Sequence, residues 1–508
     1  MTSLTHIYTV AFQGLNAVLV EVEVDLTNAQ DLLLILVGLP SAAVKESKDR
    51  VVAALRNVGH PIAAKRCTVN LAPAELKKEG AFYDLPIALG LLSSMGKISH
   101  SENLSDYLIV GELGLSGELR PIRGALAIAM LASALGKKGV ILPEANAKEA
   151  SAVPGIFVKP VKHLKDAITF FQEGAITLKS SKETQSTLFT PTKPLVDFKD
   201  IKGQQHVKRA MEIAAAGGHN IVLYGPPGTG KTMMAKAIAG IMPELSVEEA
   251  LETTKIHSIA GLLPPGESLI TQRPFRSPHH TVSYAGLIGG GSNPRPGEVT
   301  LAHNGILFLD ELPEFSRTVL EVLRQPLEDR KVTISRANGN FTYPTNFTCV
   351  AAMNPCPCGY LGHPDKPCRD TQMQIDRYRG KISGPLWDRM DMHVEVPALR
   401  FGQILDTEEG ESSSKISQRV NFAREKQKNR LGGTRTNAEM SKAELNKFAR
   451  LNFECNEVMR HAIDEMGVSA RAVDRLIRIS RTIADMENSP EIKQEHLMEA
   501  LNYRRKDV

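Results

Sequence analysis

The segment GPPGTGKT, residues 225–232, decides the fold of this 508-residue chain. It follows the apolar run NIVLY (220–224) and leads into KTMMAKAIAGIM (231–242), which has a helical pattern. A strand, a glycine-rich turn and a helix in this order form a phosphate-binding loop, in which backbone N–H groups wrap the phosphates at the positive end of the helix. The pattern therefore predicts an α/β domain that binds a nucleotide.

The residue types within this loop fit the phosphates and the magnesium ion of ATP. Glycines let the backbone approach the phosphates closely, a lysine reaches the β- and γ-phosphates, and the hydroxyl of a following threonine binds Mg²⁺. Lys231 and Thr232 stand at the last two positions. We therefore predict that ATP and Mg²⁺ are held by Gly225, Pro226, Pro227, Gly228, Thr229, Gly230, Lys231 and Thr232.

Two further apolar runs end in polar residues that suit catalysis. GILFLDELPEF (305–315) places Asp310 and Glu311 directly after a predicted buried strand, and ligands of open α/β sheets bind at that edge. We predict that Asp310 holds Mg²⁺ and that Glu311 orients and deprotonates the attacking water. FTCVAAMN (347–354) ends in Asn354, which would position the same water; a capping or turn role before Pro355 is the alternative.

These motifs, followed by a mostly helical C-terminal region, resemble an AAA+ ATPase. RPFRSPHHTVSYAGLIGGGSNPRPGEVTLAHNGILFLDELPEF (273–315) and NPCPCGYLG (354–362) resemble more closely the magnesium-chelatase-like AAA+ family of ComM and YifB. The likeness covers nearly the whole chain. It implies a loop inserted into the helix before the second motif, at 286–300, and a hairpin at 331–344.

The resemblance also gives roles to two arginines. Arg389, in GPLWDRMDM (384–392), stands where relatives carry an arginine finger, which stabilises charge on a neighbouring subunit's nucleotide. The alternative for Arg389 is a surface salt bridge with Asp388 or Asp391. Arg471, in VSARAVDR (468–475), stands at the sensor-2 position of the lid. A finger that acts on a neighbour requires an oligomer, and the family implies a homo-hexamer.

The N-terminal region resembles the proteolytic domain of Lon, but without its Ser–Lys dyad. The likeness rests on KKEGAFYDLPIALGLL (77–92) and GELGLSGELRPIRGALAIAMLASALGKKGVILPEAN (111–146). Phe82 stands where the serine would be, and the helix corresponding to 124–136 has no lysine before Lys137. Because a phenyl ring is no nucleophile, we expect a pseudo-protease domain that cleaves no peptide.

Composition divides the chain into four segments. Residues 1–172 mix β-type and helical runs, and 173–197 are rich in Ser, Thr, Lys and Pro, as in a linker. The ATPase motifs fall within 198–398, and 399–508 is mostly helical. The predicted fold class is therefore α/β, with a Lon-protease-like α+β domain, an AAA+ P-loop core and a C-terminal helical lid.

Basic residues fall on the loops that would face the pore of a ring. The net charge of +4 predicts no polyanion partner by itself. A ring of lysines and arginines would nevertheless bind phosphates in a salt-dependent way. The alternative for each residue is a solvated basic face, and KISQRVNFAREKQKNR (415–430) is a further basic run. The candidate DNA contacts are Arg273, Arg276, Arg295, Lys331 and Arg336.

By resemblance, we expect an ATP-driven hexameric DNA motor with helicase and branch-migration activity. It would promote the integration of incoming DNA by homologous recombination during natural transformation. One alternative is a chelatase-type ATPase that remodels a protein partner. Another is a protein-unfolding AAA+ module, for which 284–286 is a candidate pore loop. No signal-peptide pattern is seen and apolar runs such as 32–39 are too short to span a bilayer, so a cytoplasmic protein without membrane contacts is expected.

Three of the six cysteines fall in NPCPCGYLGHPDKPCRD, residues 354–370. Cys356, Cys358 and Cys368 with His363 would supply four ligands to a structural zinc ion, and Asp370 is the alternative to the histidine. A metal-free loop with reduced thiols is the other interpretation. A catalytic metal is not expected here, because the hydrolytic groups are assigned elsewhere.

Overall fold

The computed structural model describes residues 4–98, 102–173, 196–264, 266–291, 294–336, 339–398, 410–466 and 468–504. The chain forms two compact units. The first consists of Met1–Thr190 with Ala250–Thr271, and the second of Pro191–Glu249 with Gln272–Val508. Among the described residues, no helix has the length and apolar character needed to cross a membrane.

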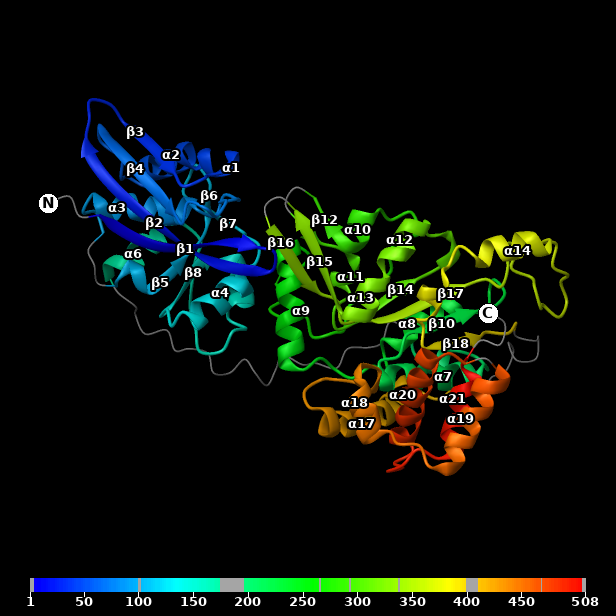
Figure 1. The fold of residues 1–508 in the computed structure, drawn as a ribbon. Helices are drawn as coiled ribbons and strands as arrows, with labels where there is room; N and C mark the ends of the chain where they lie inside the picture. The colour runs from blue at the N-terminus through cyan, green and yellow to red at the C-terminus, as the bar shows by residue number, and fades with distance from the viewer. Residues whose placement is uncertain are drawn as a thin grey trace. The chain divides into compact units, whose positions relative to one another are not determined.

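A seven-stranded sheet forms the frame of the first unit, with the strand order β3-β4-β2-β1-β5-β8-β9 (Figure 1). Strands β1 and β2 are an antiparallel hairpin, and β2 also pairs antiparallel with β4. The sequence of β2, NAVLVEVEVDLTN, alternates apolar and polar residues, so its apolar side chains lie on one face. The strands are β1 (Thr5–Gln13), β2 (Asn16–Asn28), β3 (Leu33–Val37), β4 (Lys65–Ala72), β5 (Tyr107–Ile109), β8 (Gly139–Pro143) and β9 (Phe157–Val161), with a small hairpin of β6 (Glu112–Leu113) and β7 (Leu119–Arg120).

Helix α3 (Asp84–Ser94) runs through the core of this unit, and all its residues except Ser94 are buried. Its first residue, Asp84, accepts hydrogen bonds from Arg50 Nε at 2.7 Å and from Leu113 N at 3.1 Å. A buried carboxylate without such partners would be strongly destabilising, so this pair fixes the start of α3. The other helices are α1 (Ala42–Lys45), α2 (Ser47–Asn57), α4 (Ala125–Ala134), α5 (Ala147–Ala150) and α6 (Leu164–Glu173).

Residues 250–271 belong to this unit although they follow the nucleotide-binding loop in the sequence. They include most of helix α9 (Val247–Ala260). Ser258 Oγ accepts a hydrogen bond from Gly124 N at 2.9 Å and donates one to the buried carboxylate of Glu149. Glu149 also accepts from Leu126 N at 2.8 Å. Together these bonds satisfy N–H groups at the start of α4, which have no partner within the helix.

The second unit is built on a five-stranded parallel sheet with the order β11-β14-β17-β10-β18. Strands β14 (Ile306–Leu309) and β17 (Thr348–Met353) are entirely buried, as continuous apolar runs in parallel sheets usually are. Tyr224 lies level with Met353, and Leu309 with Ala351. The residues that follow these three strands therefore meet at one edge of the sheet. The remaining strands are β10 (Ile221–Tyr224), β11 (Phe275–Arg276) and β18 (Met392–Glu395), and the helices before residue 398 are α7 (Gln205–Gly217), α8 (Lys231–Ile238), α12 (Arg317–Val322), α13 (Arg324–Asp329), α14 (Gln372–Arg379) and α15 (Gly384–Trp387).

Two hairpins lie in this unit where the resemblance places the insertion and the hairpin. In the first, β12 (Gly289–Gly290) pairs with β13 (Arg295–Pro296), between the short helices α10 (Tyr284–Ile288) and α11 (Glu298–Leu301). In the second, β15 (Lys331–Arg336) pairs with β16 (Gly339–Pro344). The hairpins contact each other, since Tyr343 Oη donates to Pro294 O at 2.8 Å.

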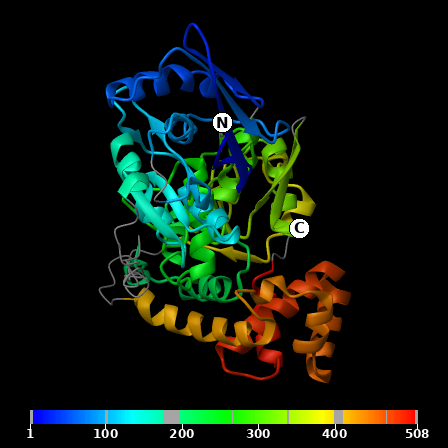
Figure 2. The ribbon, with the colours of Figure 1, turned by 90° about the vertical axis from the view of Figure 1, so that its left-hand side faces the viewer.

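The C-terminal helices share one apolar core with the parallel sheet. Val420 and Ile479, from two of these helices, belong to the same buried cluster as Ile213 of α7 and Ile221 of β10. Figures 1 and 2 show the helices, coloured orange to red, as one group. They are α17 (Ser413–Leu431), α18 (Lys442–Phe448), α19 (Phe453–Met466), α20 (Ala470–Met486) and α21 (Gln494–Asn502).

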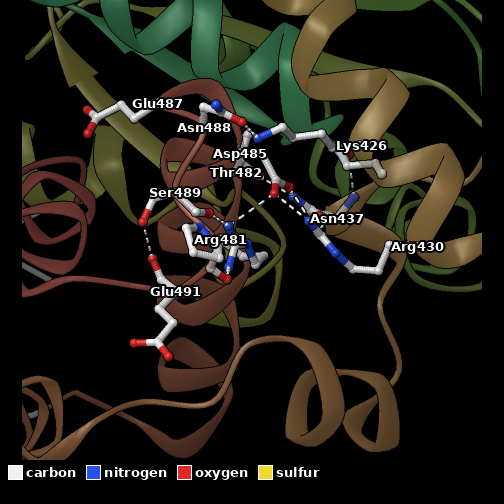
Figure 3. Close-up of polar contacts among 12 residues, drawn as sticks. Lys426, Arg430, Asn437, Arg481, Thr482, Asp485, Glu487, Asn488, Ser489 and Glu491 are labelled. Atoms are coloured by element: carbon white, nitrogen blue, oxygen red, sulfur yellow. Dashed lines mark hydrogen bonds and ion pairs between the residues drawn. The ribbon is translucent and has the colours of Figure 1, made fainter.

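A buried polar network joins these helices around Asp485 (Figure 3). Its carboxylate accepts from Asn437 Nδ2 at 2.8 Å and from Arg430 Nη1 at 2.9 Å, and lies 3.1 Å from Arg481 Nη2. Thr482, one turn earlier, bonds to His219 Nε2 at 2.8 Å. Burial lowers the pKa of His219 to about 3, so the imidazole is neutral and the bond carries no net charge. The network fixes α17 and α20 beside the sheet.

Candidate active site

The loop 225–230 adopts a conformation that its glycines make accessible. Gly228 and Gly230 have φ of +78° and +86°, which side chains other than glycine rarely tolerate. At Gly225, a Cβ atom would lie 2.1 Å from Val396 O on the neighbouring segment. Helix α8 begins at Lys231, directly after the loop. The loop thus presents backbone N–H groups at the positive end of a helix, which is a site for anions.

Lys231 lies over the loop and reaches the end of the neighbouring strand. Its Nζ donates to Gly225 O and Pro226 O, each at 2.7 Å, and to Asn354 Oδ1 at 3.2 Å. Burial lowers the pKa of Lys231 to about 8, and the nearby Asp310 carboxylate opposes this shift. The ammonium group is therefore held where phosphates would compete with the loop carbonyls for it.

Thr232 and Asp310 form an oxygen pair beside the loop. Thr232 Oγ1 donates to Asp310 Oδ2 at 2.8 Å, and Asp310 Oδ1 accepts from Glu311 N at 3.0 Å. A hydroxyl and a carboxylate are the oxygen ligands that Mg²⁺ prefers, in sites that it completes with water and substrate phosphates. These two residues fit a magnesium ion bound with ATP.

Glu311 turns its carboxylate towards a histidine. Its φ of +52° lies in the left-handed region, which is uncommon for a residue other than glycine and is often found at functional sites. The side chain is 57% exposed, and its Oε2 lies 3.4 Å from His280 Nδ1. His280 follows β11, which pairs with the strand that leads to Glu311. In the sequence, His280 is only one residue of the run 273–315, and nothing there marks its contact with Glu311.

Gln204 is a residue of this site that sequence reasoning missed. It precedes α7, has a φ of +54° and is 7% exposed. Its Nε2 donates to Thr229 O at 3.3 Å and to Pro397 O at 3.1 Å. These bonds hold the loop 225–230 against the segment that follows β18. In the sequence, only the pair Gly203-Gln204 before a helix could have drawn attention to this residue. That pair does not predict a role for Gln204, because its partner Pro397 is far away in the sequence.

The hydrogen bonds that the structure gives to Arg389 and Arg471 do not involve the loop 225–230. Arg389 Nη1 donates to Pro385 O at 2.8 Å and its Nη2 contacts the Glu328 carboxylate. Arg389 therefore forms a salt bridge, but with Glu328 and not with Asp388 or Asp391, the two partners that the alternative interpretation named. Arg389 also lines a cavity of about 370 Å³ with Tyr284 and residues of α12, α13 and β15. The role of Arg389 as a finger stays a prediction.

Arg471 is exposed at the start of α20, and its carbonyl accepts from Arg475 Nε at 3.3 Å. Arg475, which sequence reasoning did not single out, donates to Asp388 Oδ1 and Met390 O, each at 3.3 Å. Arg475 therefore fastens α20 to both neighbours of Arg389 in the sequence.

The predicted DNA contacts divide into two groups. Arg273 donates to Pro243 O at 2.6 Å and Asn304 O at 2.7 Å, and Arg276 forms a bidentate pair with Glu298 at 2.6 and 2.7 Å. These two arginines hold the second unit together, which favours the structural alternative for them. Arg295, Lys331 and Arg336 are exposed on the two hairpins, and their role as phosphate contacts stays a prediction.

The basic run 415–430 is mostly engaged within the protein. Arg419 pairs with Glu411 and Glu212, Arg424 donates to Ala215 O, and Arg430 pairs with Asp485. The expected basic face of α17 is therefore largely a set of contacts that attach the helix to its neighbours.

The loop that follows Asn354 brings three sulfur atoms together. The Sγ atoms of Cys356, Cys358 and Cys368 lie 3.4–3.6 Å apart. Asp370, rather than the predicted His363, completes this group. His363 is turned into its own loop, where its Nδ1 accepts from Asp365 N at 3.0 Å and Lys366 N at 3.1 Å.

In the N-terminal unit, Phe82 stands where Lon carries its serine, and Lys137, the first lysine after the corresponding helix, is engaged in other contacts. Phe82 stacks on Tyr83 with ring centroids 4.7 Å apart and meets the edge of Phe12. Lys137 Nζ donates to Ser105 O at 2.7 Å and lies over the Tyr8 ring. The absence of peptidase activity stays a prediction.

Comparisons with known proteins match nearly the whole chain. Family models described as magnesium chelatase subunit ChlI, subunit ChlI of Mg-chelatase and the ChlI C-terminal region match residues 197–404, 22–146 and 410–504. Competence protein ComM of Haemophilus influenzae is 43% identical over 99% of this chain and 97% of its own length. YifB of Escherichia coli is 42% identical over the same shares. Lon protease 2 of Bacillus subtilis is 32% identical over 28% of this chain and 26% of its own length. With the mixed α/β sheets and the C-terminal helices, these matches confirm the predicted fold class.

Proposed function

The chain belongs to the ComM and YifB family of magnesium-chelatase-like AAA+ proteins, and on that premise we propose that it is an ATP-driven motor that acts on DNA. ATP and Mg²⁺ are the cofactors implied by this family. More specifically, we propose that the motor has helicase and branch-migration activity, which helps incoming DNA integrate by homologous recombination. A competence protein matched along almost the whole chain supports a role in natural transformation.

One observation carries the ATPase part of the proposal. Lys231 reaches Asn354, and Thr232 reaches Asp310, so residues from three separate motifs meet at one sheet edge. Lys231 would neutralise the β- and γ-phosphates while the loop N–H groups hold them. Magnesium, when bound with ATP, would offset charge that develops on the phosphoryl oxygens. Glu311 would take the proton of the attacking water, and Asn354 would orient that water.

The exposed basic residues of the two hairpins support the DNA part. Arg295 lies on β13 and Lys331 and Arg336 lie on β15. The hairpins contact each other through Tyr343, so these cations are presented by one structure. In a homo-hexamer, each residue would occur six times around the ring, and many weak phosphate contacts would add up to salt-dependent binding. This proposal places the protein in the cytoplasm, where ATP and chromosomal DNA are both present.

A protein-remodelling function of the chelatase type is the second candidate. It is favoured by the family models, which are all named after a magnesium chelatase subunit. ComM matches the chain over nearly its whole length, N-terminal unit included, and this favours the DNA motor. The third candidate, protein unfolding, rests only on Tyr284, which is 48% exposed beside the first hairpin.

An ATP-dependent strand-displacement assay on forked and three-stranded DNA tests the proposal. We expect displacement with ATP, none with a non-hydrolysable analogue, and stimulation of ATP hydrolysis by DNA. Unfolded protein and chelatase-type partners serve as the competing stimulants in parallel reactions. If DNA neither bound nor stimulated hydrolysis while a protein did, the DNA motor would be wrong and the ATPase assignment would stand.

A further inference from the structure

The thiol loop, residues 354–370, contains a cluster of potential metal ligands that the nucleotide site does not use. The Sγ atom of Cys356 lies 3.4 Å from that of Cys358 and 3.6 Å from that of Cys368, and the last two are 3.6 Å apart. A disulfide would require about 2.05 Å. Around a tetrahedral zinc ion with Zn–S bonds of about 2.3 Å, sulfur atoms lie about 3.8 Å apart. The three thiols are therefore arranged as zinc ligands are.

A carboxylate stands at the fourth position. Asp370 Oδ2 lies 3.8 Å from Cys368 Sγ and accepts a hydrogen bond from Cys358 N at 2.8 Å. The ligand atoms of Asp370 and the three cysteines all lie within 4.8 Å of one another. The bond from Cys358 N orients the carboxylate, as partners outside a metal's ligand shell commonly do. Cys358 and Cys368 are half-buried, so an ion can reach the site.

We propose that Cys356, Cys358, Cys368 and Asp370 bind one zinc ion. Four protein ligands leave no open position, so the site is structural and not hydrolytic. His363 does not belong to this cluster of ligand atoms. Its Nδ1 accepts from two backbone N–H groups, and its ring meets the edge of Tyr360 with centroids 5.7 Å apart.

The zinc ion would brace the loop against the nucleotide site. A Cβ at Gly359, between the second and third cysteines, would lie 2.7 Å from Pro227 Cδ in the phosphate-binding loop. Arg379 Nε donates to Pro355 O at 3.2 Å and fixes the start of the thiol loop next to Asn354. The ion therefore closes a segment that contacts the phosphate-binding loop and begins at Asn354. Removing the ion should therefore make the thiol loop less rigid and weaken nucleotide binding.

Elemental analysis of the full chain, purified without a histidine tag, tests the proposal. We expect about one zinc ion per chain, since structural zinc binds tightly enough to co-purify. In competition with a chromophoric chelator, Asp370→Asn should bind zinc at least tenfold more weakly, because an amide keeps the bond from Cys358 N but is a poor zinc ligand. His363→Ala and Asp365→Asn, two changes in the same loop, are the matched controls and should bind zinc like the wild type.

Cobalt substitution of the wild-type chain tests the donor set without a variant. Three thiolates and one carboxylate should give intense d–d bands of a tetrahedral ion and thiolate-to-cobalt charge-transfer bands, and these should vanish in Cys368→Ser. No zinc in the purified protein, with no cobalt spectrum on titration, would overturn the site. Weakened binding in His363→Ala with unchanged binding in Asp370→Asn would overturn the assignment of Asp370.

Discussion

At the scale of single residues, Lys231 is the group whose charge state should control nucleotide binding. Burial lowers its pKa to about 8, so the side chain is mostly charged at pH 7 and loses its charge progressively as the pH rises through 8. Only the charged form attracts phosphates. We expect the affinity for ATP, measured with a fluorescent analogue between pH 7.5 and 9.5, to fall with rising pH, by at most about tenfold per unit.

Lys231→Ala is the control for this pH dependence. It should bind the analogue weakly at every pH, with no slope. A wild-type affinity that stayed constant up to pH 9.5 would mean that Lys231 keeps an ordinary pKa or contributes little to binding.

Glu311→Gln should separate binding from hydrolysis. The amide cannot accept the proton of the attacking water, so we expect turnover to fall by about 10²–10⁴-fold while the affinity for ATP is retained. Glu314→Gln, an exposed glutamate three residues later, is the matched control and should keep wild-type turnover. Both are measured by phosphate release and by equilibrium nucleotide binding. Undiminished turnover in Glu311→Gln would show that another group is the general base.

The residues that could be predicted from the sequence are those that a short local motif identifies. Asp310 and Asn354 follow apolar runs, and each does lie at the sheet edge beside Lys231 or Thr232. His280 and Gln204 gain their positions only from contacts with Glu311 and Pro397, which are far away in the sequence. Short-range patterns cannot reveal such pairs.

At the scale of elements, the hairpin β15–β16 should carry part of the DNA affinity. Lys331 and Arg336 are exposed on one strand. The double variant Lys331→Ala/Arg336→Ala should bind single-stranded DNA more weakly. The slope of log K against log[salt] should be shallower by about 1.4 for each subunit that contacts the strand, since each phosphate contact contributes about 0.7. Anisotropy titrations at several salt concentrations measure both quantities.

Arg276→Ala is the informative comparison for the hairpin variant. Because Arg276 is paired with Glu298, its loss should lower the melting temperature and leave the salt slope unchanged. If the hairpin variant kept the wild-type slope, or if Arg276→Ala altered it, the division of the basic residues would be reversed.

The contact between α9 and the start of α4 should stabilise the N-terminal unit. Ser258→Ala removes a donor to the buried Glu149 carboxylate and an acceptor for Gly124 N. We expect this to cost about 1–3 kcal/mol, the usual penalty for unsatisfied buried polar groups. In scanning calorimetry, a transition should shift down in Ser258→Ala and stay in place in Ser151→Ala, an exposed serine of the same unit. Equal melting curves would show that water replaces the hydroxyl.

Element types were predictable where the periodicity is strong. The alternating run of β2 and the continuous run of β14 both became strands. The basic run 415–430 did become a helix, but most of its arginines are neither free for phosphates nor on a solvated face, because they bond to α7 and α20. Charge in a sequence does not state which side chains the tertiary structure will use.

At the scale of the whole molecule, Arg389 should act on a neighbouring subunit. Among the described residues, its side chain forms hydrogen bonds with Pro385 and Glu328 and not with the phosphate-binding loop. Arg389→Ala should bind ATP but hydrolyse it about 10³-fold more slowly or worse. Lys231→Ala should bind ATP only weakly, yet still supply the finger.

Mixing these two inactive variants tests for a shared active site. In mixed rings, a subunit that binds ATP would meet a neighbour with an intact Arg389, so hydrolysis should partly return. Light scattering with and without ATP should report the hexamer under the same conditions. A hexamer whose mixed rings stay inactive would mean that Arg389 acts within its own subunit or not at all.

The division of the chain at 172, 197 and 398 stays a prediction, because composition identifies segments and not packing. Residues 250–271 lie within the predicted ATPase segment, 198–398, but pack with the N-terminal unit. The C-terminal helices share their core with the parallel sheet. Both are long-range associations that a local composition change does not mark.

Because residues 250–271 belong to the N-terminal unit, the two halves of a chain cut between residues 173 and 197 should stay associated. A nick within 173–197 would release no free N-terminal piece, because residues 250–260, on the other side of the cut, fill part of the core and the polar network of that piece. Two halves produced from separate genes should therefore find each other and co-elute. Conversely, a gene fusion or a domain exchange made at this boundary would leave the N-terminal unit without its α9 segment. The order of the chain therefore favours keeping the two units in one gene.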